Sequence, residues 1–206
     1  MKVQFFDAII IGTGQAGSPL ASFLAARNRK VAIIEKAFIG GTCVNYGCTP
    51  TKTMIASARV AYLNKRGAYF GVNHPDSAID LSAIVKRKNQ VVLDSRKSSE
   101  KRLSTDPFIT LFYGTASFES SEVVCVVNDK NEIQFLTSKI IVINTGAKNQ
   151  IPDLPGIENV PYLDSTSIMD LDAIPKQLII LGGSYIALEF GQLFNRLGSN
   201  VTIIER

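Results

Sequence analysis

The segment Gly12-Thr-Gly-Gln-Ala-Gly17 decides the fold of this 206-residue chain. An apolar run over residues 3–11 leads into it, and a helix-compatible stretch over residues 18–29 follows it. A second apolar run, over residues 31–34, then ends at Glu35. Short apolar runs predict buried strands, and the glycines predict a tight turn before the helix. The chain is therefore predicted to open with a strand, a turn, a helix and a second strand.

This first unit has the spacing of a dinucleotide-binding turn. Gly12 permits the tight turn, Gly14 lets the backbone approach a pyrophosphate, and Gly17 lets the helix pack closely on the strand. The helix N-terminus offers unpaired N–H groups to phosphates, and a carboxylate at the end of the next strand can accept hydrogen bonds from ribose hydroxyls. A tight turn without a ligand is the alternative. The candidate cofactor-binding residues here are Gly12, Gly14, Gln15, Ala16, Gly17, Glu35 and Lys36.

The same pattern recurs near the end of the chain. Residues 178–181 predict a strand, and the turn Gly182-Gly-Ser-Tyr-Ile-Ala187 opens a helix predicted over residues 185–197. Residues 201–204 predict the next strand, which ends at Glu205. We therefore predict a second dinucleotide-binding turn.

Three residues of this second unit bear on its ligand. Ser184 stands where the first turn has Gly14, and Ala187 occupies the third glycine position, where alanine is accepted. Glu205 favours a free ribose 2′-hydroxyl, and hence NAD, whereas Arg206 is compatible with a 2′-phosphate. The candidate cofactor-binding residues here are Gly182, Gly183, Ser184, Ile186 and Glu205.

The composition is that of a globular protein. The chain has 22 basic and 18 acidic residues, a net charge of +4, and 46% hydrophobic residues. These values exclude intrinsic disorder and fibrous repeats. No apolar run approaches the roughly 18 residues that span a bilayer, and the aspartate within the first apolar stretch leads us to expect no secretory signal there. The sequence predicts a cytoplasmic protein that does not bind membranes.

Residues 80–104 hold the whole excess of positive charge, with seven basic and three acidic residues. Their apolar residues repeat at helical spacing, and no aromatic residue lies among them. This pattern predicts one long amphipathic helix with a solvated basic face rather than a nucleic-acid-binding stripe. We therefore predict no nucleic-acid partner.

The segment Gly40-Gly-Thr-Cys43-Val-Asn-Tyr-Gly-Cys48-Thr-Pro-Thr-Lys52 carries two of the three cysteines. Residues five apart on an ideal helix are separated by about 7.5 Å of rise, which is beyond the Cα limit of a disulfide. Gly47 and Pro50 are the expected source of a distortion, and a pair held in this way suits reversible redox chemistry. A zinc site is the alternative, but two cysteines and the distant His74 make a poor ligand set, so no metal site is predicted. Cys125 is predicted to be a core residue.

This Cys segment resembles the active-site segment of the class I pyridine nucleotide-disulfide oxidoreductases, and it is most similar to that of mercuric-reductase-like members. The family order also holds for the two glycine turns and for the strand end Asn144-Thr-Gly146, although many members have alanine at position 144. The resemblance implies an α/β fold and the N-terminal part of a longer protein. A Rossmann-like FAD-binding domain is expected over residues 1–151, a connection over 152–175 and the truncated start of a Rossmann-like NAD(P)-binding domain over 176–206.

The resemblance also implies the roles of individual residues. Cys43 meets the substrate, whereas Cys48 lies against the flavin. Lys52 lies near the flavin and pairs with Glu189, and Tyr185 is an aromatic gate on the nicotinamide side. FAD is expected on the first domain and NAD(P)H on the second. The further cofactor-binding residues that the resemblance implies are Gly41, Thr42, Lys52, Thr145, Gly146, Tyr185 and Glu189.

The activity implied by the resemblance is the transfer of a hydride from NAD(P)H to FAD and of electrons onward to a Cys43–Cys48 disulfide. That pair would then reduce a small-molecule disulfide or a metal ion. An activity like that of dihydrolipoamide dehydrogenase or glutathione reductase is an alternative, as are a non-catalytic FAD-binding redox sensor and an inactive truncated fragment. Family members are homodimers whose partner subunit supplies a His-Glu pair. The only histidine of this chain, His74, is predicted to be a surface residue in a loop.

Overall fold

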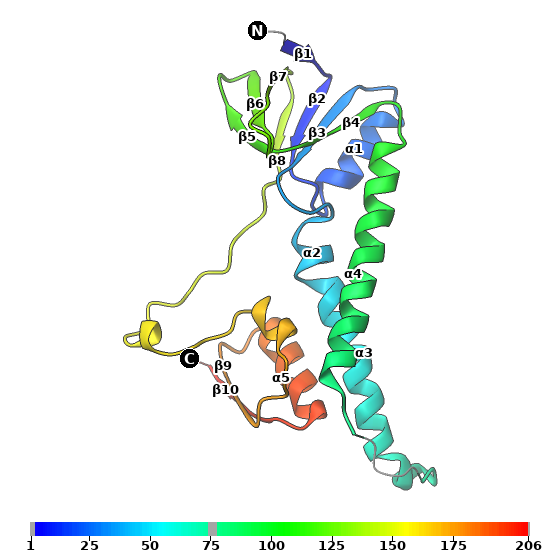
Figure 1. The fold of residues 1–206 in the computed structure, drawn as a ribbon, viewed down its shortest axis with the longest axis vertical. Helices are drawn as coiled ribbons and strands as arrows, with labels where there is room; N and C mark the ends of the chain where they lie inside the picture. The colour runs from blue at the N-terminus through cyan, green and yellow to red at the C-terminus, as the bar shows by residue number, and fades with distance from the viewer. Residues whose placement is uncertain (1–2, 74–77, 206) are drawn as a thin grey trace. The chain divides into compact units, whose positions relative to one another are not determined.

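The computed structural model describes residues 3–73 and 78–205 of the chain (Figure 1). The predicted loop residue His74 and the predicted NADP-compatible residue Arg206 lie outside the described residues. The described part is a mixed α/β structure with two parallel sheets and one sheet of mixed direction, which confirms the predicted fold class.

The chain divides into two compact units, each built from two separate stretches of sequence. The first unit consists of Met1–Asn45 and Leu93–Lys148, and the second consists of Tyr46–Val92 and Asn149–Arg206. The domain limits predicted at residues 151 and 175 stay predictions.

A four-stranded parallel sheet forms the centre of the first unit. Its strands are β4 (Ile109–Tyr113), β3 (Val31–Glu35), β2 (Ala8–Ile11) and β8 (Ile141–Ile143), in that order across the sheet. Ile9 and Ile34 belong to one apolar cluster, whereas Ile10 and Ile33 belong to another. Because side chains alternate between the faces of a strand, both faces of the sheet are buried. Burial on both faces explains the continuous apolar runs in the sequence.

Two layers cover these faces (Figure 1). On one side, Ala21 and Ala25 of α1 (Gly17–Ala25) and Leu103 of α4 (Leu81–Ser104) pack against Ile10 and Ile33. On the other side lies a second sheet with the strand order β1-β7-β6-β5. Its strands are β1 (Val3–Phe5), β5 (Thr115–Phe118), β6 (Val123–Val127) and β7 (Ile133–Thr137).

The single strand expected over residues 3–11 is wrong, because the structure splits it between these two sheets. β1 pairs with β7, whereas β2 pairs with β3 and β8. Asp7 lies at the break, where its N–H donates to the carbonyl of Lys30 at 2.8 Å and its Oδ2 accepts from the Lys30 N–H at 2.8 Å. The Asp7 side chain takes part in the backbone pairing at this point. The chain pairs with β7 before Asp7 and with β3 and β8 after it.

The second unit joins the helix that begins within the Cys segment to the second glycine turn. Its elements are α3 (Cys48–Lys65), η1 (Gly67–Phe70), η2 (Ile157–Asn159), η3 (Ser167–Asp170), β9 (Gln177–Leu181), α5 (Tyr185–Leu197) and β10 (Asn200–Ile204). Met54 of α3, Met169 of η3 and Phe194 of α5 are buried in one cluster. β9 and β10 form a parallel pair that also contacts α5. The bounds of α5 are those predicted from the sequence.

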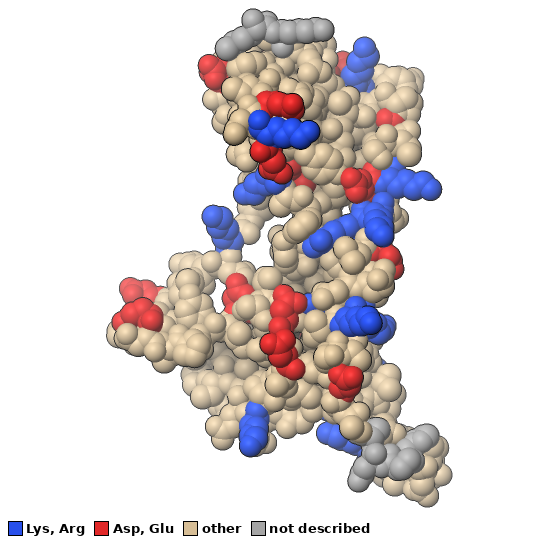
Figure 2. Space-filling model, in the orientation of Figure 1, with Lys and Arg blue, Asp and Glu red and all other residues tan. Residues whose placement is uncertain are grey.

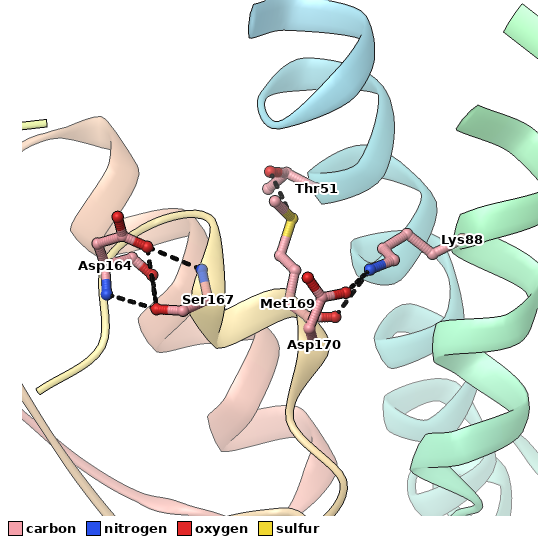
Figure 3. Close-up of polar contacts among 6 residues, drawn as sticks. All are labelled: Thr51, Lys88, Asp164, Ser167, Met169 and Asp170. Atoms are coloured by element: carbon pink, nitrogen blue, oxygen red, sulfur yellow. Dashed lines mark hydrogen bonds and ion pairs between the residues drawn. The ribbon is translucent and has the colours of Figure 1, made fainter. Parts of the chain in front are cut away.

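The basic stretch forms one helix, α4, but its face is not simply solvated as predicted. Lys88 is buried, its Nζ donates to the carbonyl of Met169 at 3.0 Å, and it forms an ion pair with Asp170 (Figure 3). Thr51 Oγ1 donates to Met169 Sδ at 3.5 Å in the same place. These contacts fix η3 against α3 and α4. On the face of the protein drawn in Figure 2, the blue Lys and Arg side chains lie among red Asp and Glu side chains.

Replacement of Lys88 by methionine is expected to destabilise the second unit. Methionine keeps most of the apolar stem, but the Met169 carbonyl loses its ammonium donor. A buried polar group left without its partner costs about 1–3 kcal/mol, whereas Asp170, whose side chain is 62% exposed, can return to water. The midpoint of urea unfolding measures the change, with Lys86→Met at an exposed position of the same helix as the control. Equal midpoints for the two variants would contradict a stabilising role for Lys88.

Asp164 holds the segment that leads into η3, and its contribution to stability is expected to depend on pH. It accepts hydrogen bonds from the Ser167 N–H at 2.8 Å and from Asn149 Nδ2 at 2.9 Å, and these lower the pKa of its carboxyl to about 2 (Figure 3 shows the Ser167 contacts). A carboxyl whose folded pKa lies below the unfolded value of about 3.9 stabilises the fold above that value and loses this contribution as the pH falls toward 2.

Asp164→Asn is therefore expected to lower the free energy of unfolding at neutral pH and to make less difference in acid. Because Asp164 is largely exposed, solvent screening limits the effect to about 1 kcal/mol or less. The difference between wild type and variant, measured by urea unfolding from pH 7 to pH 3, should narrow below about pH 4. Asp153→Asn, on the same connection, is the control, and a difference that does not change with pH would contradict the prediction.

Among the helices of the two described stretches, none is both long and apolar enough to cross a membrane.

Candidate functional site

The first glycine turn has no room for side chains at its two ends. Gly12 has φ of +106°, and a Cβ added there would lie 2.2 Å from the carbonyl oxygen of Asn144. A Cβ on Gly17 would lie 2.2 Å from the carbonyl oxygen of Gly12. The Gly12 N–H donates to the carbonyl of Ile34 at 2.8 Å, which anchors the turn to β3. The turn is thus a backbone surface at the N-terminus of α1, whose first turn contains no acidic residue.

Glu35, at the end of β3, is held beside this turn by Thr13. Its Oε2 accepts from the Thr13 N–H at 3.1 Å and from Thr13 Oγ1 at 2.5 Å, and its Oε1 accepts from the Ala37 N–H at 3.0 Å. Thr13 is only 1% exposed, and its Oγ1 also accepts from the Gly40 N–H at 3.1 Å. The carboxylate therefore has a defined position at the sheet edge. The role of Thr13 was not predicted from the sequence, although Thr13 lies inside the glycine motif.

The start of the Cys segment packs directly on the glycine turn. Gly40 and Gly41 have φ of +104° and +60°, and a Cβ on Gly41 would lie 2.6 Å from the Cα of Gly14. α2 (Gly41–Asn45) begins at this contact and carries the half-buried Cys43. The structure thus brings the Cys43 helix to the first glycine turn.

Residues 144–146 complete this edge of the sheet. Asn144 Nδ2 donates to the carbonyl of Gly12 at 3.3 Å, and the Asn144 N–H donates to the carbonyl of Ile11 at 2.8 Å. A Cβ on Gly146 would lie 3.9 Å from Oγ1 of Thr42. Asn144, at the position where the resemblance led us to expect alanine, therefore tightens the turn through its side chain. The predicted residues Gln15, Ala16, Lys36, Thr42, Thr145 and Gly146 are exposed at this edge.

The second predicted cysteine begins the next helix. Cys48 is the first residue of α3 and is exposed. The helix breaks at Gly47, which has φ of −129° and ψ of −114°, whereas Pro50 lies within the first turn of α3. Gly47 and Pro50 were both expected to distort the helix, and the break lies at Gly47. Cys125, predicted to be a core residue, is half-buried on β6.

The second unit contains the ion pair that the resemblance implied. Lys52 Nζ on α3 contacts Glu189 Oε1 on α5, and the Lys52 side chain is more than half exposed. An exposed pair of this kind contributes little to stability. Because Lys52 lies one helical turn from Cys48, the pair matters more for the charge near that cysteine than for the stability of the fold.

The second glycine turn repeats the backbone pattern of the first. Gly182 has φ of +97°, and its N–H donates to the carbonyl of Ile204 at 2.8 Å. The Gly183 N–H donates to the carboxylate of Glu205. Ser184 precedes α5 in an extended conformation. The predicted residues Tyr185 and Ile186 begin α5 and are exposed, and Tyr185 shows 71% of its surface.

Two other residues of this region were missed by the sequence analysis. Asn45, inside the Cys segment, is buried, and Arg96 of α4 donates to it. Nothing in the local pattern distinguishes Arg96 from the other basic residues of α4, because its partner lies 51 positions away. Within residues 3–73 and 78–205, no group of three or more His, Cys, Asp or Glu side chains is arranged to hold a metal ion.

Tyr113 lies at the end of β4, the strand beside β3. Burial, together with the nearby Glu100 carboxylate to which its hydroxyl donates, raises the pKa of Tyr113 well above its ordinary value, so the hydroxyl stays protonated even in alkaline solution. It acts as a fixed hydrogen-bond donor between β4 and α4.

Known proteins share the sequence and the fold. Mercuric reductase from Bacillus cereus is 39% identical over 201 residues, which cover 98% of this chain and 31% of that protein. Dihydrolipoyl dehydrogenase from Chlamydia pneumoniae is 37% identical over 203 residues, covering 98% of this chain and 43% of that protein. The solved structure of a Cu(II) complex of the HOCl-induced flavoprotein disulfide reductase RclA from Escherichia coli matches with a TM-score of 0.83 and 35% identity, over 100% of this chain and 43% of that one.

The chain thus spans less than half the length of these relatives. The family profile described as pyridine nucleotide-disulphide oxidoreductase matches residues 6–206. Proteins of this family bind FAD and use NAD(P)H as the electron donor. The resemblance read from the Cys segment is therefore confirmed, and the chain belongs to the pyridine nucleotide-disulphide oxidoreductase family.

Proposed function

We propose that the complete protein is an NAD(P)H-dependent flavoprotein reductase in which Cys43 and Cys48 form the redox pair. The observation that carries this proposal is the contact between Gly41 and Gly14, where a Cβ would lie 2.6 Å from the facing Cα. Because Gly14 belongs to the predicted pyrophosphate-binding turn, this contact seats the Cys43 helix beside the cofactor. A turn that only joined a strand to a helix would not need a thiol-bearing segment packed against it.

The residues present fit FAD at the first turn. Gly12, Gly14 and Gly17 keep side chains away from the pyrophosphate, and the α1 N-terminus supplies N–H groups and partial positive charge. The Glu35 carboxylate lies where ribose hydroxyls are bound in such units. When bound, FAD supplies two-electron chemistry that links a nicotinamide to a disulfide. By the same reasoning Gly182, Gly183, Ser184 and Glu205 would hold the nicotinamide cofactor, and Glu205 favours NADH over NADPH.

The cysteines carry the proposed exchange with the substrate. In the reduced pair, the Cys43 thiolate attacks a substrate sulfur, the substrate S–S bond breaks, and the leaving thiolate takes a proton. Cys48 then attacks the mixed disulfide, which releases the second substrate thiol and leaves Cys43 and Cys48 oxidised. With a metal ion, the two thiols supply the same two electrons. Lys52 and Glu189 set the charge near Cys48, and Tyr185 would cover the nicotinamide side.

The substrate class is a small-molecule disulfide or a metal ion. Mercuric reductases and a dihydrolipoyl dehydrogenase are among the relatives, so mercuric ion and lipoamide are the first substrates to compare. A homodimer stays a prediction of the family resemblance, and a cytoplasmic location stays a prediction from the composition.

The test uses the complete purified protein. We expect it to release FAD on heating and to oxidise NADH faster than NADPH when mercuric ion, lipoamide or oxidised glutathione is added. The rate with each acceptor, corrected for the rate without one, identifies the substrate. A colourless protein that does not bind added FAD would overturn the proposal, and a flavoprotein that reduces none of the acceptors would favour a redox sensor.

A further inference from the structure

The carboxamide of Asn45 ties together the segment that precedes the Cys43 helix. Asn45 ends α2 and is 7% exposed. Its Nδ2 donates toward the carbonyl oxygens of Phe38 at 3.2 Å, Ile39 at 3.1 Å and Gly41 at 2.8 Å. One amide nitrogen thus faces three carbonyls, which only a donor can satisfy. The amide must keep this orientation, because its oxygen in the same place would be repelled by all three.

Arg96 of α4 sets that orientation. Its Nε donates to Asn45 Oδ1, and its guanidinium lies over the ring of Phe38 with Cζ 3.8 Å from the ring centroid. The planar guanidinium can stack on a ring and donate in its own plane at the same time, which a lysine ammonium cannot do. Arg96 therefore holds both the amide and one end of the segment that the amide binds.

The segment held in this way is the one that contacts the glycine turn. It contains Gly40, whose N–H donates to Thr13 Oγ1 at 3.1 Å, and Gly41, which packs on Gly14. Cys43 lies on α2 between Gly41 and Asn45, so both ends of its short helix depend on the same amide. A five-residue helix has too few internal hydrogen bonds to keep its own place.

We propose that Arg96 is a positioning residue of the redox site, which acts through Asn45 to seat the Cys43 helix on the glycine turn. The inference rests on the proposed function for the identity of the cofactor at that turn. It gives a function to one of the basic residues that the charge pattern assigned to a solvated face.

The test compares Arg96→Ala with Arg102→Ala, a matched change at an exposed arginine of the same helix. Two quantities are measured in the complete protein: the FAD dissociation constant, from the quenching of flavin fluorescence, and the rate at which iodoacetamide alkylates Cys43 in the reduced apoprotein, from the mass of its peptide. Loss of a charge-assisted hydrogen bond corresponds to a change of about tenfold or more in an equilibrium constant. We expect Arg96→Ala to weaken FAD binding and to speed alkylation by this factor, and Arg102→Ala to change either by less than about twofold.

Guanidinium ion provides the readout that a merely structural residue would not give. In Arg96→Ala, millimolar guanidinium chloride can occupy the vacated place between the Phe38 ring and Asn45 Oδ1. It should restore both quantities toward wild type, whereas sodium chloride at the same concentration should not. Arg96→Lys keeps the charge and should lose less than Arg96→Ala, which provides a second variant if the alanine variant folds poorly.

Wild-type values in Arg96→Ala, or a loss that guanidinium leaves unchanged, would overturn the assignment. Failure of the proposed function is distinguishable from failure of this inference. If the wild-type protein bound no FAD, the proposed function would fail. The rate of Cys43 alkylation and its rescue by guanidinium would still test the role of Arg96.

Discussion

Serine at position 43 is expected to abolish NAD(P)H-driven reduction of the substrate while leaving the affinity for FAD within about twofold of wild type. Cys43 is half-buried on α2, and the smaller serine adds no clash there. A hydroxyl can neither attack a disulfide nor form one, so the loss should be at least about a thousandfold. Steady-state turnover with the acceptor found for the wild type measures it.

Serine at position 48 should give the same loss, since one thiol cannot hold two electrons as a disulfide. Cys125→Ser is the matched control, because Cys125 is also half-buried but lies on β6 of the second sheet. It should retain wild-type turnover. If either Cys43→Ser or Cys48→Ser kept full activity, the assignment of the redox pair would be wrong.

Alanine at position 41 is expected to weaken FAD binding by about tenfold to a hundredfold, because forcing an extra carbon into a close-packed contact costs about 1–3 kcal/mol. The added Cβ would lie 2.6 Å from the Cα of Gly14 and 3.2 Å from its nitrogen, both of which are backbone atoms. The Cys segment and the glycine turn would then have to separate. The FAD dissociation constant measures the effect.

Gly71→Ala separates this contact from backbone strain. Gly71 also has positive φ, +74°, but a Cβ there meets nothing within 4 Å. Both alanine variants should lose about 1–2 kcal/mol of stability from the left-handed conformation, but only Gly41→Ala should lose FAD. Equal FAD affinity in the two variants would show that the Gly41–Gly14 contact is not needed for cofactor binding.

Local patterns in the sequence predicted those parts of the structure that depend on near neighbours. The first glycine turn, the helix over residues 185–197 and the long basic helix all follow from periodicity and glycine spacing over a few turns of chain. The Cys segment was identified as a unit, and Gly47 was identified as a distortion within it.

The parts that the sequence did not predict depend on distant partners. Lys88 looks like any surface lysine until Met169 and Asp170, more than 80 positions away, supply its acceptors. Arg96 acquires its role only from Asn45, and the break in the opening strand lies where Asp7 binds Lys30. In each case the role of the residue depends on hydrogen bonds to a distant part of the chain, and a hydropathy pattern does not reveal such bonds.

The two glycine turns differ in how firmly each holds its acidic residue. The Glu35 carboxylate receives the Thr13 hydroxyl and two backbone N–H groups, whereas the corresponding position of the second turn is Gly183, which offers its N–H to Glu205 and has no hydroxyl. A rigid acceptor binds more tightly because less order is lost on association. Under the proposed function, this difference fits a tightly held FAD at the first turn and a nicotinamide cofactor that is released after each reaction at the second.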